Sequence, residues 1–220
     1  MKLKINRQVL LNNLSKVSKA VNPKVPLIAL TGIKFTLSEH QLELIGSDSD
    51  LSIKCVIKDE TNNQKIMEIE ELGSIVINEK IICEIIRKVE SEMVEIEVVD
   101  NLAKIRSDKS IFSVNCIPAI DYPNISFESD ALGAEISLDA LELKNTLDQT
   151  LFATSDKEAR AILTGLNLKC DRDTLECVAT DTFRLSKKII EIKENVSFNV
   201  IVPRSSLDEI NKIIELGKEV

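Results

Sequence analysis

Apolar residues near the N-terminus recur at the spacing of a helix that buries one side. They are Leu10, Leu14, Val17 and Val21, and at about 3.6 residues per turn they share one face. Asn6 stands just before this segment, where a helix N-cap is expected because its side chain can accept a hydrogen bond from the first turn. Strict alternation of apolar and polar residues then predicts three consecutive antiparallel strands, at residues 30–37, 41–48 and 51–57.

A short strand at residues 3–5, LKI, precedes the first helix, and the same order of strand, helix and three strands is expected a second time. A strand at residues 74–78 leads to a helix whose apolar face holds Ile82, Ile85, Ile86 and Val89. Three alternating runs follow, near residues 93–99, 102–108 and 111–117. A β-α-β-β-β unit is therefore written twice within about the first 120 residues. The next segment, rich in Pro, Asp and Ser, is typical of a linker.

A shift of 133 positions superposes residues 3–48 on residues 136–181 without a gap. Asn6 then coincides with Asp139, the motif LTGIKF with LTGLNL, and Ser47-Asp48 with Thr180-Asp181. A constant offset across a helix and its strands indicates a duplicated domain. We therefore predict an α+β fold of tandem copies, each built from two β-α-β-β-β units, with a first domain at residues 1–121, a linker at 122–133 and a second domain at 134–220.

The second copy is expected to be incomplete. Residues 199–214 match residues 74–89 and place a second helix over roughly residues 205–216, but no further strands follow before Val220. The sheet of this copy would lack about three strands, and each core side chain left uncovered would lose ~1.5–3 kcal/mol of burial. The sequence is accordingly interpreted as a truncated piece of a longer chain.

Composition excludes several classes of protein. Hydrophobic residues make up 44% of the chain and charged residues 29%, as in soluble globular domains. No apolar run approaches the ~20 residues of a membrane span. The cysteines form no C-x-x-C pair, which favours buried thiols in a reducing cytoplasm over a disulfide framework or a zinc site. They are Cys55, Cys83, Cys116, Cys170 and Cys177.

The formal net charge of -8 argues against a global attraction to nucleic acid, yet it leaves room for a local basic surface. Cations lie on the polar faces of the predicted helices, while acids concentrate in strands and loops. The cations are Lys16, Lys19, Lys80, Arg87 and Lys88, with Lys144, Arg204 and Lys212 less clearly oriented. Two interpretations stay open for them: contacts to phosphates, or ordinary solvated helix faces.

The sequence shows no clear catalytic motif and no clear metal-binding motif. The sole histidine, His40, falls in a predicted hairpin turn with no nucleophile motif beside it. Asp48 and Asp50 lack the spacing of a calcium loop, and turn-forming acids are the better interpretation. No cofactor or metal site is therefore predicted.

The stretch VATDTFRLSKK, residues 178–188, holds an acid, an aromatic ring and an arginine close together. Asp181 would need a partner base or metal to act in a hydrolase, and its repeat mate Asp48 lies in the other copy. The match of Asp48 to Asp181 instead indicates a shared hairpin role, with the carboxylate accepting backbone hydrogen bonds. Enzyme site, hairpin structure and docking surface remain the three alternatives from the residues alone.

The motifs LTGIKF, GSDSDLSI, DYPNISF, RAILTGLNL, ATDTFRLS and VPRSSLDEI, in this order, resemble the bacterial sliding clamp family, the beta subunit of DNA polymerase III. The resemblance implies a ring around double-stranded DNA, with helices lining the inner face and antiparallel sheets outside, formed by a head-to-tail homodimer of full-length subunits. It implies a cytoplasmic, non-catalytic processivity factor that needs no cofactor and does not read DNA sequence. It also makes the helix cations DNA-facing candidates and adds Lys24 from the first loop.

The resemblance further implies a hydrophobic pocket for short peptide motifs of the replicative DNA polymerase, the clamp loader and repair proteins. Its residues here are Leu163, Thr180, Thr182, Phe183, Arg184 and Leu185. Thr182 and Phe183 depart from the family pattern of a small residue and a histidine before Arg-Leu, so peptide preference is expected to differ. The resemblance places the opposite wall of the pocket in the end of the second domain and in a third domain, which this sequence is expected to lack, so this chain is expected to bind such peptides weakly or not at all. A clamp-derived peptide-binding scaffold that does not encircle DNA is the alternative function.

Overall fold

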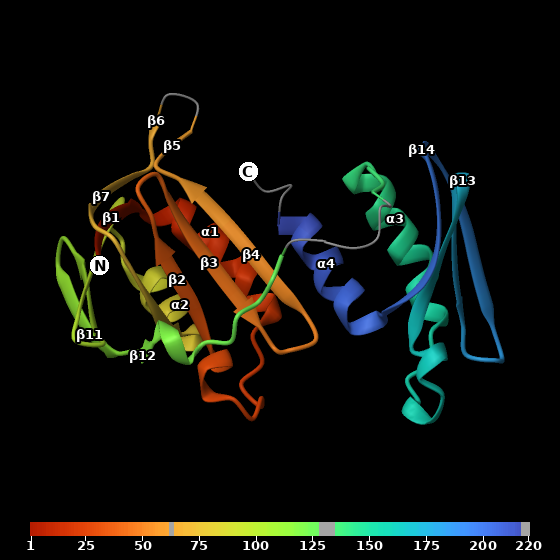
Figure 1. Cartoon of the computed structure of the whole chain (residues 1–220), viewed down its shortest axis with the longest axis horizontal. Helices are drawn as coiled ribbons and strands as arrows, with labels where there is room; N and C mark the ends of the chain where they lie inside the picture. The colour runs from red at the N-terminus through yellow and green to blue at the C-terminus, as the bar shows by residue number, and fades with distance from the viewer. Residues whose placement is uncertain (62–63, 128–134, 217–220) are drawn as a thin grey trace. The chain divides into compact units, whose positions relative to one another are not determined.

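The computed structural model describes residues 1–61, 64–127 and 135–216 and divides the chain into two units, Met1–Phe127 and Glu128–Val220 (Figure 1). Residues 128–133 of the expected linker, and residues 134 and 217–220 of the expected second domain, lie outside the described residues. The two units are described separately below.

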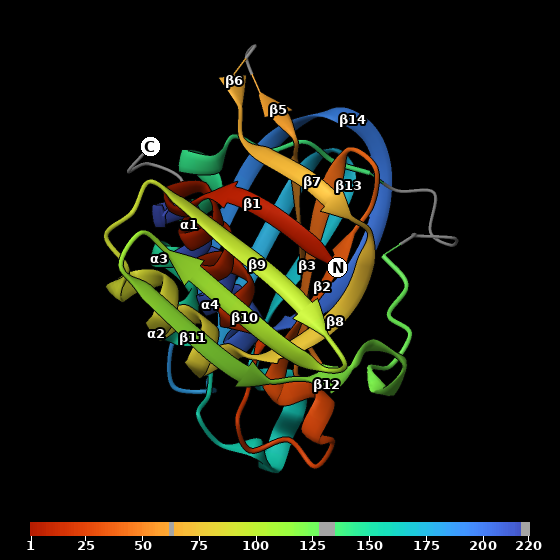
Figure 2. The same cartoon turned by 90° about the vertical axis from the view of Figure 1, so that its left-hand side faces the viewer.

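Two five-stranded antiparallel sheets form the strand layers of the first unit. In the first sheet, seen in front in Figure 2, the strand order is β11 (Ser110–Asn115), β10 (Leu102–Ser107), β9 (Met93–Val99), β1 (Lys2–Asn6) and β7 (Met67–Glu71). In the second sheet it is β12 (Ile117–Pro118), β8 (Gly73–Asn78), β2 (Gly32–Leu37), β3 (Gln41–Ser47) and β4 (Ser52–Lys58). The remaining short elements are the pair β5 (Glu60–Thr61) and β6 (Gln64–Lys65) and the 3-10 helices η1 (Ser18–Ala20), η2 (Ile28–Thr31) and η3 (Ala119–Asp121).

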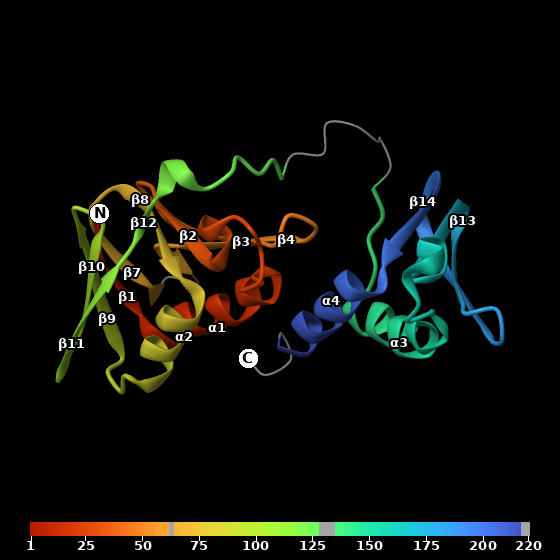
Figure 3. The same cartoon turned by 90° about the horizontal axis from the view of Figure 1, so that it is seen from below.

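Helices α1 (Arg7–Val17) and α2 (Glu79–Lys88) lie next to each other on one side of the first unit (Figure 3). Each begins at an asparagine N-cap. The Asn6 side chain accepts a hydrogen bond from the Val9 N–H at 3.1 Å, which confirms the predicted cap, and Asn78 accepts one from the Ile81 N–H at 3.2 Å. The predicted apolar faces are buried against the sheets: Leu10, Leu14 and Val17 from α1, and Ile82, Ile85 and Ile86 from α2.

The strands expected in the first unit are all present, and the structure adds the short pair β5–β6 and the strands β7 and β12. β7 pairs with β1 from Lys2↔Glu71 to Ile5↔Met67, and β12 pairs with β8 at Ile117↔Val76. Beyond β12, Tyr122 is only 5% exposed and packs with Leu30 and Val76. The beginning of the expected linker is thus part of the first unit's packing.

The described part of the second unit has one two-stranded sheet with helices on one side (Figure 3). The elements are α3 (Ala140–Thr150), η4 (Leu151–Ala153), η5 (Glu158–Leu163), β13 (Gly165–Thr180), β14 (Leu185–Pro203) and α4 (Arg204–Leu216). Asp139 caps α3 as predicted, accepting from the N–H groups of Leu141 and Glu142. The helix expected at roughly 205–216 is α4. A core of its own, which includes Leu147, Leu166 and Leu207, joins the helices to the sheet.

The cysteines are all free thiols, and Cys83, Cys170 and Cys177 are buried, in agreement with the prediction. Burial raises the pKa of the Cys83 and Cys177 thiols to about 11, which disfavours the nucleophilic thiolate at neutral pH. Among the described residues, no helix is long and apolar enough to cross a membrane.

Candidate peptide-docking site and DNA-facing helices

The turn between β13 and β14 is held together by Asp181. Its Oδ1 atom accepts hydrogen bonds from the backbone N–H groups of Phe183 and Arg184, both at 2.9 Å. The hydroxyl of Thr180 donates to the carbonyl of Arg184 at 2.7 Å and accepts from the N–H of Thr182 at 3.1 Å. These bonds fix the positive φ of Thr182, 81°, a region that non-glycine residues rarely adopt.

The first unit contains the same turn 133 residues earlier. Asp48 Oδ1 accepts from the N–H groups of Asp50 and Leu51 at 3.0 and 2.8 Å, and the N–H of Ser49 donates to the Ser47 hydroxyl at 3.1 Å. Ser49 has a φ of 83°. The predicted structural role shared by Asp48 and Asp181 is therefore confirmed.

The second-unit turn differs from its twin by an anchored arginine. The Nε atom of Arg184 lies 2.9 Å from Asp181 Oδ2, and its guanidinium carbon lies 5.7 Å from the centroid of the Phe152 ring. Backbone hydrogen bonds from Arg184 and Phe183, helped by the Arg184 charge, lower the pKa of Asp181. Both carboxylate oxygens are engaged in holding the turn, so the geometry gives no support to Asp181 as a general acid or base.

A cavity of about 210 Å³ lies beside this turn. The turn contributes Asp181, Thr182 and Phe183, and the segment before β13 contributes Ser155, Lys157, Arg160 and Leu163. Of the sequence-predicted pocket residues, Leu163, Thr182 and Phe183 line this cavity. The other three do not line it. Thr180 forms hydrogen bonds within the turn, the Arg184 guanidinium lies over the Phe152 ring, and Leu185 is exposed at the start of β14.

Several neighbours of this cavity escaped the sequence analysis. Ser155, Lys157 and Arg160 follow no periodic pattern, although Arg160 is the first residue of the motif RAILTGLNL. Exposed apolar side chains extend the surface: Phe183 is 94% exposed, and Phe152, Ile162 and Leu185 are also exposed. A small cavity lined by Leu163 and the exposed Phe183 ring suits the anchor of a short peptide.

The predicted DNA-facing cations of the first unit are available for contacts. Lys16 and Lys19 are half-buried, and the others, Lys24, Lys80, Arg87 and Lys88, are exposed. No ion pair to any of them is found among the described residues.

The corresponding cations of the second unit are paired with acids of the same unit. Lys144 lies 2.7 Å from Asp148, and Lys212 lies 2.6 Å from Glu209, which raises the pKa of Lys212. Arg204 contacts Asp156 at 3.0 Å and Asp208 at 3.4 Å. The two units therefore present different local charge on their helices.

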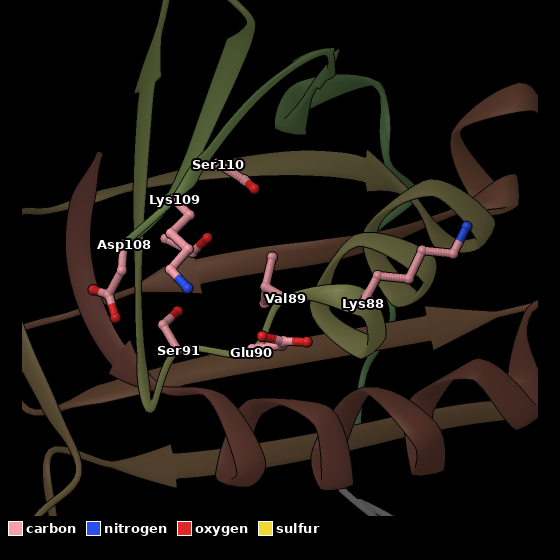
Figure 4. A pocket seen from close by; sticks show the side chains of 8 residues that line it. Lys88, Val89, Glu90, Ser91, Asp108, Lys109 and Ser110 are labelled. Carbon is pink, nitrogen blue, oxygen red and sulfur yellow. The ribbon is translucent and has the colours of Figure 1, made fainter.

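A larger cavity, of about 460 Å³, lies in the first unit between the C-terminal end of α2 and the β10–β11 turn, lined by residues 88–91 and 107–110. In Figure 4 the Lys109 side chain points into the space above Ser91, whereas Lys88 points away from it. The hydroxyl of Ser91 is buried and has no hydrogen-bond partner among the described residues. Lys88 is thus oriented to the helix surface rather than to this cavity.

The residues considered for metal or catalytic chemistry have structural surroundings. His40 is a surface side chain 3.2 Å from Asp59, consistent with the predicted solvated turn. Asp48 closes the turn that also contains Asp50. Within the described residues, no group of three or more His, Cys, Asp or Glu side chains could hold a metal ion.

Two family models match the chain. The model of the DNA polymerase III beta subunit, N-terminal domain, covers residues 1–126, and that of the central domain covers residues 137–220. The beta sliding clamp of Bacillus subtilis (strain 168) is 39% identical over 223 residues, covering 100% of this chain. That of Halalkalibacterium halodurans is 35% identical over 222 residues, covering 98%. The chain spans 58% of the length of each of these relatives.

Solved structures give the same result. The crystal structure of the DNA polymerase sliding clamp from Bacillus subtilis matches with a TM-score of 0.93 at 38% identity, covering 97% of this chain and 56% of that one. The DNA polymerase III beta chain from Streptococcus pneumoniae matches with a TM-score of 0.90 at 27% identity, covering 96% and 56%. The clamp fold that the motif resemblance implied, with its duplicated α+β domain, is thereby confirmed.

Proposed function

This chain belongs to the DNA polymerase III beta subunit family, and from that premise we propose that its protein is a DNA polymerase processivity factor. It acts as a ring-shaped sliding clamp that encircles duplex DNA without sequence specificity. It is non-catalytic and cytoplasmic, and it tethers the replicative polymerase and other partners. Its two domains are those expected from the repeat, residues 1–121 and 134–220, and the beginning of the expected linker 122–133 packs on the first domain through Tyr122.

One observation carries the DNA part of the proposal. The first-unit helices and the loop after α1 hold cations without ion-pair partners in the described part of the chain, although the chain as a whole carries a net charge of -8. Lys16, Lys19, Lys24, Lys80, Arg87 and Lys88 are the proposed phosphate contacts. Lysine and arginine contacts to phosphates neutralise backbone charge without reading bases. Such contacts suit a protein that must slide.

The partner site proposed for replicative polymerase, clamp loader and repair proteins is the cavity beside the Asp181 turn. Leu163, Thr182 and Phe183 line it, and Phe183 is almost fully exposed. Thr180 and Arg184 hold the turn, and Leu185 extends the apolar surface. An exposed ring on a rigid turn provides an anchor at low entropic cost.

A head-to-tail homodimer of the full-length subunit is also proposed. Strand β11 is the edge of the first sheet, and its Ile111 side chain is 70% exposed. An edge strand has unpaired backbone groups that another chain can bind. This edge therefore supports an assembly through the first unit.

The alternative is a peptide-binding scaffold that does not encircle DNA. The ion pairs of Lys144, Arg204 and Lys212 favour it, because they neutralise the second unit's candidate DNA contacts. Salt distinguishes the two functions: a scaffold keeps peptide binding but lacks a steeply salt-dependent association with DNA.

The decisive experiment is topological. The full-length subunit should be retained on nicked circular DNA after loading and should slide off once the circle is linearised. Equal retention on circular and linear DNA would contradict encirclement. Retention on neither, with peptide binding intact, would favour the scaffold.

A further inference from the structure

A small apolar cluster of the first unit joins segments that are far apart in the sequence. Its buried members come from η2, β8 and the segment after β12; they are Ala29, Leu30, Val76 and Tyr122. The partly buried side chains that pack against it are Val25, Ile45, Ile117 and Ile125. The main core of the unit is a separate cluster. The loop after α1 and the segment after β12 therefore meet in a contact of their own.

The loop after α1 reaches this cluster through Val25. Residues 22–28 are exposed except for Val25, which is partly buried. The Lys24 N–H donates to Asn22 Oδ1 at 2.9 Å, and the Val25 N–H donates to the Asn22 carbonyl at 3.4 Å. These hydrogen bonds shape the loop from within, whereas the Val25 side chain connects it to the cluster. Lys24, next to it, stays exposed.

Tyr122 supplies the only ring of this cluster among the described residues. It is 5% exposed, and its hydroxyl donates to the Ile45 carbonyl in β3 at 3.4 Å. The Nζ atom of Lys34, in β2, lies 5.7 Å from the centroid of the ring. The ring is therefore held by two strands of the second sheet. Removing it would leave a void beneath the loop, because close-packed side chains refill such a space only in part.

We propose that Tyr122 is a positioning residue for duplex DNA binding, because its ring holds the loop that presents Lys24. The inference rests on the proposed phosphate contact of Lys24 and adds a residue that touches no phosphate itself. Residues 117–127 include no lysine or arginine, so charge gives no reason to connect them with DNA. A loop that is already held in place loses less conformational entropy when its lysine binds a phosphate.

The test measures the fluorescence anisotropy of a labelled duplex with the whole chain at several low salt concentrations. Lys24→Gln should lower the affinity about two- to fivefold, the range of one exposed ion pair, and lower the slope of log affinity against log salt by up to about 0.9. Tyr122→Ala keeps every cation and should lower both quantities, because Lys24 is no longer held. In the Lys24→Gln background, Tyr122→Ala should have no further effect. A Tyr122→Ala effect that persists in that background would overturn the inference.

Two variants of the same segment are the controls. Tyr122→Phe keeps the ring and should restore the binding that Tyr122→Ala loses. Phe127→Ala removes a ring outside the cluster, whose centroid lies 5.0 Å from Lys54 Nζ, and should leave the affinity for DNA unchanged. Equal losses in Tyr122→Ala and Phe127→Ala would also overturn the inference.

Amide hydrogen exchange, measured by NMR, tests the loop without DNA. In Tyr122→Ala the amides of Lys24, Val25 and Leu30 should exchange several-fold faster relative to those of β10, which lies between β9 and β11. An equal acceleration of both sets would mean that Tyr122 contributes only to global stability, which contradicts a positioning role. If Tyr122→Ala does not fold, Ile125→Ala removes a partly buried side chain of the same cluster and should give the same pattern.

The remaining outcomes distinguish this inference from the proposed function. If Lys24→Gln binds DNA like the parent while Lys80→Gln/Arg87→Gln/Lys88→Gln binds more weakly, the inference fails but DNA binding by the first unit stands. If Lys24→Gln weakens binding and Tyr122→Ala changes neither affinity nor exchange, only the inference fails. If none of these cation variants changes the affinity, the proposed phosphate contacts fail together with it.

Discussion

The carboxylate of Asp181 binds Arg184 twice, through Oδ1 to the backbone N–H at 2.9 Å and through Oδ2 to the guanidinium Nε at 2.9 Å. Its repeat mate Asp48 makes the backbone contact with Leu51 at 2.8 Å, but Leu51 offers no cation. The duplicated turn is therefore common structure, and the arginine is what the second copy adds. Because the Arg184 guanidinium also lies over the Phe152 ring, the Asp181 carboxylate positions a side chain that connects the turn to η4.

The first prediction concerns the pH dependence of this turn. The folded pKa of Asp181 lies below its ordinary value of 3.8, so the carboxylate stabilises the turn above that value and the contribution is lost as pH falls through the lowered pKa. The amide signals of Phe183 and Arg184 should titrate together with a midpoint below 3.8. NMR measures this directly, and Asp181→Asn should remove the titration. A midpoint at or above the ordinary value would contradict the role assigned to Asp181.

The second prediction uses a pair of equivalent glycines in the two units. A Cβ added at Gly32 would lie 2.8 Å from the Ile77 carbonyl oxygen, and one added at Gly165 would lie 2.6 Å from that of Val202. Both contacts are with the backbone of a paired strand, which cannot move away freely. Each Gly→Ala change should destabilise its unit by about 1–3 kcal/mol.

The single tyrosine makes this prediction specific to a unit. Tyr122 packs in the first unit, so Gly32→Ala should lower the urea midpoint measured by tyrosine fluorescence. Gly165→Ala should leave that midpoint unchanged and lower the urea midpoint measured from the amide NMR signals of the second unit. Exposed Ser113→Ala is the control and should change stability by less than about 0.5 kcal/mol. Unchanged urea midpoints in both glycine variants would show that the paired strand can shift to make room for the Cβ without a loss of folding free energy.

Features set by local sequence could be predicted well. The N-caps Asn6 and Asp139 depend on residues within one helical turn. The constant offset of 133 residues relates Asp48 to Asp181 from the sequence alone. Two of the ion pairs were also open to prediction, because Lys144 and Asp148 are four residues apart and Lys212 follows Glu209 by three.

Features set by distant pairing could not be predicted. Strand β7 forms by pairing with β1, more than sixty residues away, and its short acidic run gives a weak strand pattern on its own. Arg204 contacts Asp156 across 48 residues, and no local spacing reveals that ion pair. Lys157 and Arg160 lie on an irregular segment, where no periodicity shows which side chains line a cavity.

The third prediction separates free cations from paired ones. In Lys80→Gln/Arg87→Gln/Lys88→Gln, the slope of log affinity for duplex DNA against log salt should fall by about 0.9 for each phosphate that the variant no longer neutralises. Lys144→Gln/Arg204→Gln/Lys212→Gln should change the slope less, because these side chains are already in ion pairs. Fluorescence anisotropy of a labelled duplex measures both slopes. If both triple variants and the parent protein gave equal slopes, the cations on these helices would be exposed to solvent without contacting DNA phosphates.

The last prediction tests whether the segment after β12 is packed on the first unit. Burial raises the pKa of Tyr122 from 10.0 to about 12, because the ring packs against Leu30 and Val76 and its charged form is poorly solvated there. A raised pKa means that the neutral phenol stabilises the fold below pH ~10 and that this contribution is lost as pH rises toward the folded value. Tyrosinate absorbance should therefore titrate near 12 in the native chain and near 10 in denaturant.

Leu30→Ala opens the packing around the ring and should lower the native midpoint, whereas the distant Ser113→Ala should not. A native midpoint near the ordinary value would mean that Tyr122 is solvated and that the segment does not pack on this unit.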